Sequence, residues 1–157
     1  MRMRDFHPAI AKRVRHLGVA VSDQDGEMTF VESGDLTGSS SGSHLASATP
    51  PLEGRHYQAF EHRSVPTTRI DSLIAKGEKP PDVIKIDIEG AEYLALKGGR
   101  KLLSEKKPLL LLEVHHICLM FHIQRYLLEQ GYTTTLLDEA NAVASRCFMM
   151  GTAKRAG

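Results

Sequence analysis

The chain has 157 residues, enough for one domain with a hydrophobic core and too few for two full domains. Its apolar and charged fractions, 41% and 25%, are those of an ordinary soluble globular protein. Lys and Arg total 20 against 19 for Asp and Glu. The resulting net charge of +1 argues against binding to nucleic acid or to an anionic membrane surface through bulk charge.

The apolar stretches and the cysteines bear on the compartment in which the protein works. The longest apolar stretches, 108–112 and 117–121, are far shorter than the roughly 20 residues that span a bilayer. No apolar segment follows the basic start at 1–4, so we expect no signal peptide. Cys118 and Cys147 form no Cys-x-x-Cys motif and suit a reducing compartment, which predicts a cytoplasmic protein.

The first half of the chain predicts short strands around a long loop. Apolar and small residues alternate over 17–22, turn-forming residues follow at 23–26, and alternation resumes over 27–33, which together predict a hairpin. In the segment 34–54, 11 of 21 residues are Gly, Ser or Pro, which predicts a flexible loop. A surface insert and a substrate-binding loop are both open interpretations of this segment.

The second half predicts alternating strands and helices. An extended segment over 56–65 and a helix over 68–76 that ends at Gly77 lead into this region. Further strands are expected at 82–88, 108–114, 132–138 and 146–153, and helices at 90–105 and 118–130. The Gly98-Gly99 pair weakens the first of these two helices in its middle. The order predicts an α/β domain with a parallel core, in which only the last two strands pair antiparallel.

Ionisable side chains follow two strands of this core. In open α/β sheets, ligands bind outside the carboxyl ends of the parallel strands. Asp87, Glu89 and Glu92 follow the first strand, and Lys85 is a candidate partner for Asp87, because a buried carboxylate is costly without one. For Glu92 we favour a structural interpretation, since a carboxylate at a helix start is stabilised by the helix dipole.

The next strand ends in Glu113, Val114, His115 and His116, and Glu113 and His115 should point the same way. Taken singly, each histidine fits a partly buried structural residue. Together with the carboxylates they could form one cleft with two chemical interpretations. The cleft could bind a divalent metal, although no His-x-x-x-His spacing supports this. Alternatively it could hold an organic cation beside a base that accepts a proton from a substrate hydroxyl.

Three segments of the chain form a familiar series: AVSDQDGE at 20–27, RIDSL at 69–73 and IKIDIEGAE at 84–92. With the whole of 65–116, they resemble the FkbM family of S-adenosylmethionine-dependent methyltransferases. The most specific part is 84–92, which is similar to the KxDxEGxE segment of the family, while 20–27 resembles its hairpin and 69–73 its "LDxLL" helix start. The resemblance extends from about Gly18 to the C-terminus.

This resemblance implies a Rossmann-like, class I methyltransferase sheet, mostly parallel with an antiparallel last strand, and S-adenosylmethionine as cofactor. It implies methyl transfer to a hydroxyl of a small molecule or saccharide. Asp87 would lie beside the methionine end of the cofactor, and Ala20, Val21 and Ser22 beside its adenine. The residues that would face the acceptor are Glu89, Glu113 and His115. Of these, His115 or Glu89 would act as the base.

The N-terminal part of the family pattern is missing. Only residues 1–17 precede the matching domain at 18–157. They contain no glycine-rich turn and have room for about one short helix. We therefore expect the family fold without its first two strands, which would leave an open edge between 18–22 and 83–88. These two segments could pair directly, a second copy or partner chain could cover the edge, or the segment could be mobile.

Three functions stay open from the sequence. The chain could be a methyltransferase, either active or inactive at this length. It could be a non-catalytic binding or assembly module that keeps half of the fold. It could also be a metal-dependent enzyme that uses Asp87, Glu89, Glu113 and His115.

Overall fold

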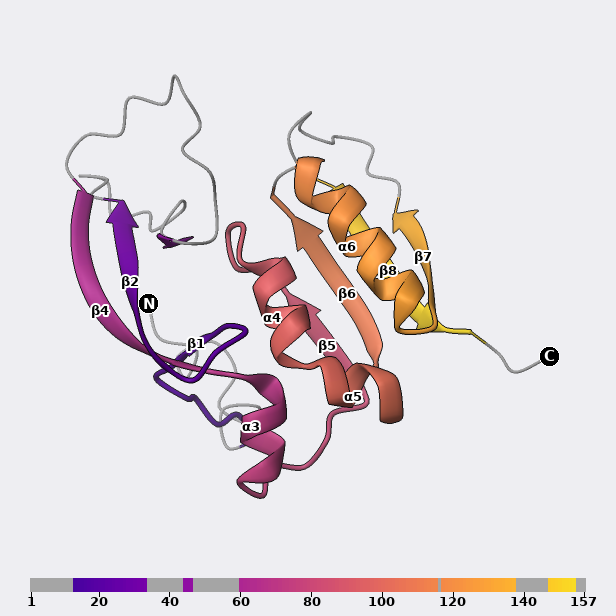
Figure 1. The fold of residues 1–157 in the computed structure, drawn as a ribbon, viewed down its shortest axis with the longest axis horizontal. Helices are drawn as coiled ribbons and strands as arrows, with labels where there is room; N and C mark the ends of the chain where they lie inside the picture. Colours follow the sequence, from indigo (N-terminus) through magenta and orange to yellow (C-terminus); the bar gives the residue numbers. More distant parts are fainter. Residues whose placement is uncertain (1–12, 34–43, 47–59, 116, 138–146, 155–157) are drawn as a thin grey trace.

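The structure is a computed structural model that describes residues 13–33, 44–46, 60–115, 117–137 and 147–154. It contains two four-stranded sheets, connected by the helix α3 (Ile70–Ala75) and the segment that follows it (Figure 1). The predicted loop at 34–54, apart from 44–46, lies outside the described residues. Of the short helix expected within 1–17, residues 1–12 lie outside the described part, and residues 13–17 are not helical.

The first sheet has the order β1-β4-β2-β3. Its strands are β1 (Ala20–Val21), β2 (Gly26–Ser33), β3 (His44–Leu45) and β4 (Phe60–Thr68). The expected hairpin of 17–22 with 27–33 is wrong, because β4 lies between β1 and β2. All eight residues of β2 pair antiparallel with β4, and β1 instead runs parallel to the end of β4. β4 occupies one edge of β2 and β3 pairs with the other, so β1 joins the free edge of β4.

The turn between β1 and β2 contacts the junction of β4 and α3 through Asp25, rather than closing a hairpin. The Asp25 carboxylate accepts hydrogen bonds from Thr68 Oγ1, from the Arg69 backbone and side chain, and from Ser72 Oγ, at 2.7–3.1 Å. These bonds, led by that from Ser72, hold the pKa of Asp25 well below its usual value. The turn is thereby fastened to the junction of β4 and α3.

The second sheet has the order β5-β6-β8-β7. Its strands are β5 (Val83–Ile86), β6 (Leu109–Val114), β7 (Tyr132–Leu137) and β8 (Cys147–Ala153). β5 and β6 are parallel, while β8 is antiparallel to both β6 and β7, which confirms the predicted final pair. The expectation of a mostly parallel sheet is not met: only β1–β4 and β5–β6 pair parallel in the described residues, since β2 and β8 each reverse direction inside their sheets.

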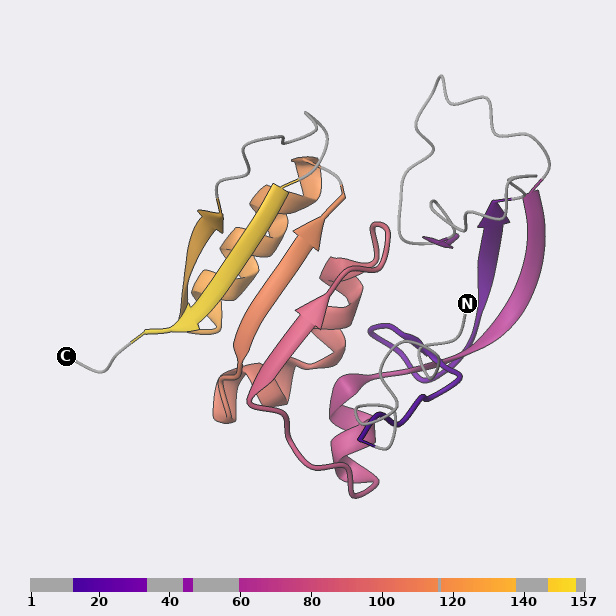
Figure 2. The same cartoon turned by 180° about the vertical axis from the view of Figure 1, so that it is seen from behind.

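Three helices cover one face of the second sheet: α4 (Glu92–Gly98), α5 (Arg100–Glu105) and α6 (Ile117–Glu129) (Figures 1 and 2). The helix predicted over 90–105 is two helices, because the chain turns at Gly99 between α4 and α5. Asp71 of α3 accepts the backbone N–H groups of Lys101 and Leu102, which satisfies donors at the start of α5.

The main core lies between these helices and the sheet. Its fully buried members include Leu96, Leu103, Leu110, Ile123, Leu127, Tyr132 and Met149. The Tyr132 hydroxyl donates to the Pro108 carbonyl at 3.1 Å, and burial raises the pKa of Tyr132 to about 12. Within the described residues, no helix is both long and apolar enough to cross a membrane.

β5 is an end strand of its sheet. Of the three alternatives for this edge, the direct pairing of 18–22 with 83–88 is wrong, because β1 joins β4 instead. On the outer side of β5, no strand pairs with it among the described residues, and Val83 is 53% exposed. Cover by a second chain stays a prediction.

The packing of β1 against α4 yields a first test. A Cβ on Gly98 would lie 2.0 Å from the Ser22 carbonyl oxygen, a backbone atom that cannot rotate away. We expect Gly98→Ala to lower the free energy of unfolding by about 1–3 kcal/mol, as in other overpacked sites. Urea denaturation measures this change.

Gly18→Ala is the control, because no atom lies within 4 Å of a Cβ at Gly18. It should leave the urea midpoint nearly unchanged. Equal midpoints for the two variants would contradict the close packing of β1 on α4.

Candidate functional site

The parallel pair β5–β6 brings the ionisable residues together. Ile86 pairs with Leu112 in this register, so Asp87 and Glu113 follow side by side at the carboxyl edge of the sheet. Glu113 belongs to β6, and His115 follows the end of this strand. This neighbourhood is the one that the strand pattern predicts.

His115 faces three carboxylates through one ring nitrogen. Its Nε2 lies 3.4 Å from Glu113 Oε1, 3.6 Å from Asp87 Oδ1 and 3.6 Å from Glu89 Oε2. The His115 side chain is only 9% exposed. The structure therefore brings together all four of the predicted residues at the edge of the second sheet. We call Asp87, Glu89, Glu113 and His115 the carboxylate–histidine cluster.

Glu92 is the residue whose importance the sequence did not reveal. Its side chain is fully buried, and Oε1 lies 2.9 Å from His115 Nδ1 and accepts the Gly90 N–H at 2.9 Å. Its other oxygen, Oε2, is buried without a hydrogen-bond partner among the described residues. The helix-start interpretation of Glu92 is therefore insufficient, because the side chain points inward to fix the histidine. The KxDxEGxE resemblance includes Glu92 as its last residue, but a glutamate in the first helical turn gives no signal that separates these two roles.

The surroundings of His115 favour its protonated form. The hydrogen bond to Glu92 is the main cause that raises the pKa of His115, and the charges of Glu89, Glu92 and Glu113 add to it, while burial opposes them. The contribution to folding stability is fully present below the usual pKa of 6.5. It is lost as the pH rises through the folded-state pKa.

Asp87 and Glu89 lie on the loop that follows β5 rather than on a strand face, because the strand ends at Ile86. Lys85 donates to Asp87 Oδ2 at 2.7 Å, as expected. Glu89 has a φ of +52°, a left-handed conformation that is unfavourable for a side chain with a Cβ. Backbone strain of this kind gathers at functional sites.

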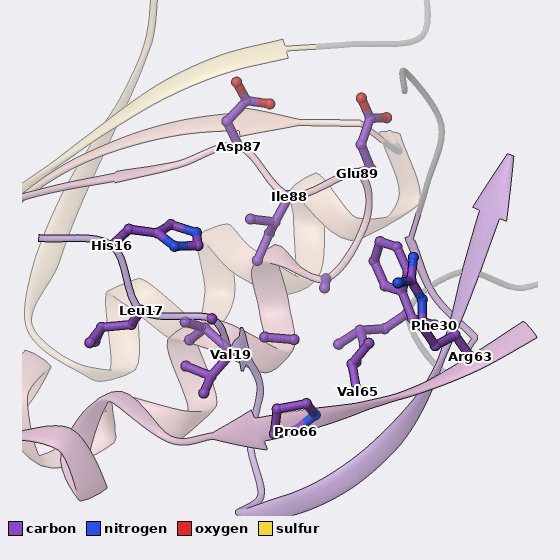
Figure 3. Close-up of a pocket in the computed structure, with 15 residues that line it drawn as sticks. His16, Leu17, Val19, Phe30, Arg63, Val65, Pro66, Asp87, Ile88 and Glu89 are labelled. Atoms are coloured by element: carbon purple, nitrogen blue, oxygen red, sulfur yellow. The ribbon is translucent and has the colours of Figure 1, made fainter. Parts of the chain in front are cut away.

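A cavity of about 710 Å³ lies between the first sheet and residues 87–91. Figure 3 shows Ile88 pointing toward Val19, while the carboxylates of Asp87 and Glu89 lie on the other side of the loop, at the rim. The remaining wall is mainly apolar and includes Leu17, Ala20, Val21, Phe30, Val65 and Pro66.

The predicted adenine-side residues divide into two groups. Ala20 and Val21 line the cavity. Ser22 does not line it: the residue is fully buried, and its N–H donates to the Thr68 carbonyl at 3.0 Å. The structure gives Ser22 a packing role between β4 and α4.

Comparisons with known proteins agree with this architecture. A family model described as the methyltransferase FkbM domain matches residues 5–134. The chain belongs to the FkbM methyltransferase family. Its fold is similar to the crystal structure of methyltransferase FkbM from Methylobacillus flagellatus KT, with a TM-score of 0.59 and 21% sequence identity. That alignment covers 94% of this chain and 31% of the other, so this FkbM chain spans about a third of its structural relative. A search of curated proteins found no match.

A second test addresses the bond between Glu92 and His115 in this FkbM domain. Glu92→Gln removes a negative charge and replaces the carboxylate acceptor, so the pKa of His115 should fall. NMR titration of the imidazole resonances measures this shift. Glu105→Gln on the exposed surface of α5 is the control and should leave the His115 titration unchanged. An unmoved His115 pKa in Glu92→Gln would contradict the described contact.

A third test addresses the strain at Glu89. Glycine adopts positive φ without steric cost, whereas alanine does not. The Glu89→Gly variant should therefore be more stable than the Glu89→Ala variant, with a free energy of unfolding about 1 kcal/mol higher. Both variants lose the same carboxylate, so their difference isolates the backbone term. Chemical denaturation of the two variants measures it, and a more stable alanine variant would argue against the left-handed conformation.

Proposed function

We propose that this chain is the acceptor-side part of an S-adenosylmethionine-dependent methyltransferase that methylates a hydroxyl of a small molecule or saccharide. One observation carries the proposal: His115, largely buried and oriented by Glu92, faces Asp87, Glu89 and Glu113. Two of these carboxylates, those of Asp87 and Glu89, line a mainly apolar cavity. Family membership supports methyl transfer as the reaction. The net charge of +1 is consistent with a small neutral acceptor.

The cavity is suited to part of S-adenosylmethionine. Its volume of about 710 Å³ is in the range of small-molecule sites, and its apolar wall offers Ala20 and Val21 as a surface for the adenine ring. The carboxylates of Asp87 and Glu89 at the rim would attract the positively charged methionine end. When bound, this cofactor supplies an electrophilic methyl group that an acceptor oxygen can displace from sulfur.

His115 is the proposed general base. Because Glu92 holds Nδ1, the nitrogen that faces the rim is Nε2, which would accept the proton of the acceptor hydroxyl. Because the pKa of His115 is raised, its neutral imidazole is a stronger base, and this neutral form becomes populated only at higher pH. Methyl transfer should therefore increase as the pH rises through the His115 pKa. Glu89 is the second candidate for this role.

A second candidate function is an assembly module in which another chain, or a second copy, covers β5. Two observations favour it. β5 has no strand partner on its outer side among the described residues. Figure 2 shows the sheet from the side opposite the helices. By the strand register, this face also carries Val83, Leu109, Leu111 and Met150, which are exposed or half-buried. Open strand edges and apolar faces are usually covered in native proteins.

Calorimetric titration with S-adenosylmethionine tests the proposed function. We expect binding by the 157-residue chain and its loss in Asp87→Ala, because this carboxylate would attract the cationic end of the cofactor. Asp82→Ala is the matched control: Asp82 also flanks β5, but it pairs with Lys106 and is exposed. Transfer of a radiolabelled methyl group to a panel of hydroxylated acceptors then tests the reaction.

No heat at millimolar S-adenosylmethionine would contradict cofactor binding by this chain. If the chain then forms dimers in sedimentation analysis, the assembly function is favoured. Equal loss of binding in Asp87→Ala and Asp82→Ala would contradict the assigned role of Asp87.

A further inference from the structure

We propose that Asp87, Glu113 and His115 form a binding site for one divalent transition-metal ion, with Mn²⁺ as the best-suited ion. One carboxylate oxygen from each acid and the His115 Nε2 all lie within 4.8 Å of one another. Two carboxylates and an imidazole are a ligand set that suits Mn²⁺ or Zn²⁺. The residues come from the ends of two neighbouring strands, so no local sequence spacing announces them.

The two distances from His115 Nε2 fit a shared ion better than direct hydrogen bonds, and the two carboxylate oxygens lie within 4.8 Å of each other. His115 Nε2 is 3.4 Å from Glu113 Oε1 and 3.6 Å from Asp87 Oδ1, whereas an N–H···O bond is about 2.7–3.2 Å. An ion about 2.0–2.2 Å from each ligand atom separates neighbouring ligand atoms by roughly 3.0–3.6 Å. Small side-chain adjustments would therefore complete the coordination.

Glu92 provides an independent observation. Metal-binding histidines usually donate their second ring N–H to a carboxylate, which fixes the ring and the tautomer. The fully buried Glu92 lies 2.9 Å from Nδ1 of His115, and the Gly90 N–H holds the same oxygen. This arrangement leaves Nε2 as the nitrogen for an ion, and burial of the ring limits its freedom to turn away.

Charge also favours a cation at this point. Four carboxylates lie within 3.6 Å of the single His115 ring, and Lys85 contributes one ammonium group through its contact with Asp87. A proton on Nε2 can point toward only one carboxylate, whereas a divalent ion attracts several at once. Glu89, at 3.6 Å from Nε2, would stand beside the ion as a further oxygen donor or as the acceptor of a proton.

The role of the ion rests on the proposed function, although its binding does not. A divalent ion polarises a bound hydroxyl and lowers its pKa. Here it would hold the acceptor oxygen near the rim of the cavity. With the ion on Nε2, His115 cannot accept a proton, so the hydroxyl proton would pass to Glu89, the second candidate for the base. The chain would then be a metal-assisted O-methyltransferase unit.

Binding of Mn²⁺ to the full chain, after chelator treatment and desalting, tests the site. Electron paramagnetic resonance of free Mn²⁺ should reveal one bound ion per chain, and calorimetry with Zn²⁺ alone is the second probe. Glu113→Gln and His115→Gln should each weaken binding at least tenfold. Glu92→Gln should weaken it by about 10-fold to 100-fold, as expected for a residue that orients a ligand.

Glu105→Gln is the control for an exposed acid, and circular dichroism checks the fold of every variant. Absence of binding for both ions at about 1 mM would overturn the site. So would one-site binding that Glu113→Gln and His115→Gln leave unchanged. The S-adenosylmethionine titration is repeated with excess chelator, so that metal binding and cofactor binding are measured separately. Mn²⁺ binding without cofactor binding supports the metal site and refutes the proposed function. Cofactor binding without Mn²⁺ binding refutes the metal site and supports the proposed function.

Discussion

The parallel register of β5 and β6 is the constraint on which the site depends. Because Ile86 lies opposite Leu112, the residues that follow the two strands meet at one edge of the sheet. A shift of one residue would reverse the faces of one strand relative to the other and separate Asp87 from Glu113. The buried Leu110, Leu112 and Val114 specify this register, since only one face of β6 packs against the helices. Core packing therefore sets the chemistry at the rim.

The buried Glu92 links this core to the cluster. A buried carboxylate is costly unless it is hydrogen-bonded or paired. Glu92 satisfies one oxygen with the Gly90 N–H and His115 Nδ1, at the start of α4 where the helix dipole also favours negative charge. The bond between Glu92 and His115 therefore stabilises a helix start and orients a reactive ring. A stabilising residue of the fold and a positioning residue of the site are here the same side chain.

Local patterns in the sequence predict local features of this structure well. The apolar run of β6, the end of α6 before Gly131 and the weakness at Gly98-Gly99 are all visible, because each depends on neighbouring residues. Asp87 and His115 could also be selected, since strand ends gather ligands in α/β sheets. The order of β1, β4 and β2 could not be predicted, because it depends on pairing across the long segment 34–59. The inward direction of Glu92 is likewise a tertiary feature without a local signal.

The two sheets explain why family membership and activity are separate questions for this chain. The cavity takes one wall from β1 and its neighbours, and its rim from the segment after β5, yet β1 and β5 belong to different sheets. Nothing in the described hydrogen-bonded sheets therefore holds these two walls at a fixed width; that task falls to α3, α4 and the close contact of Gly98 with Ser22. The pair of Glu113 and His115 comes from the second sheet alone, through β6 and the residue that follows it, so it does not depend on the distance between the two walls.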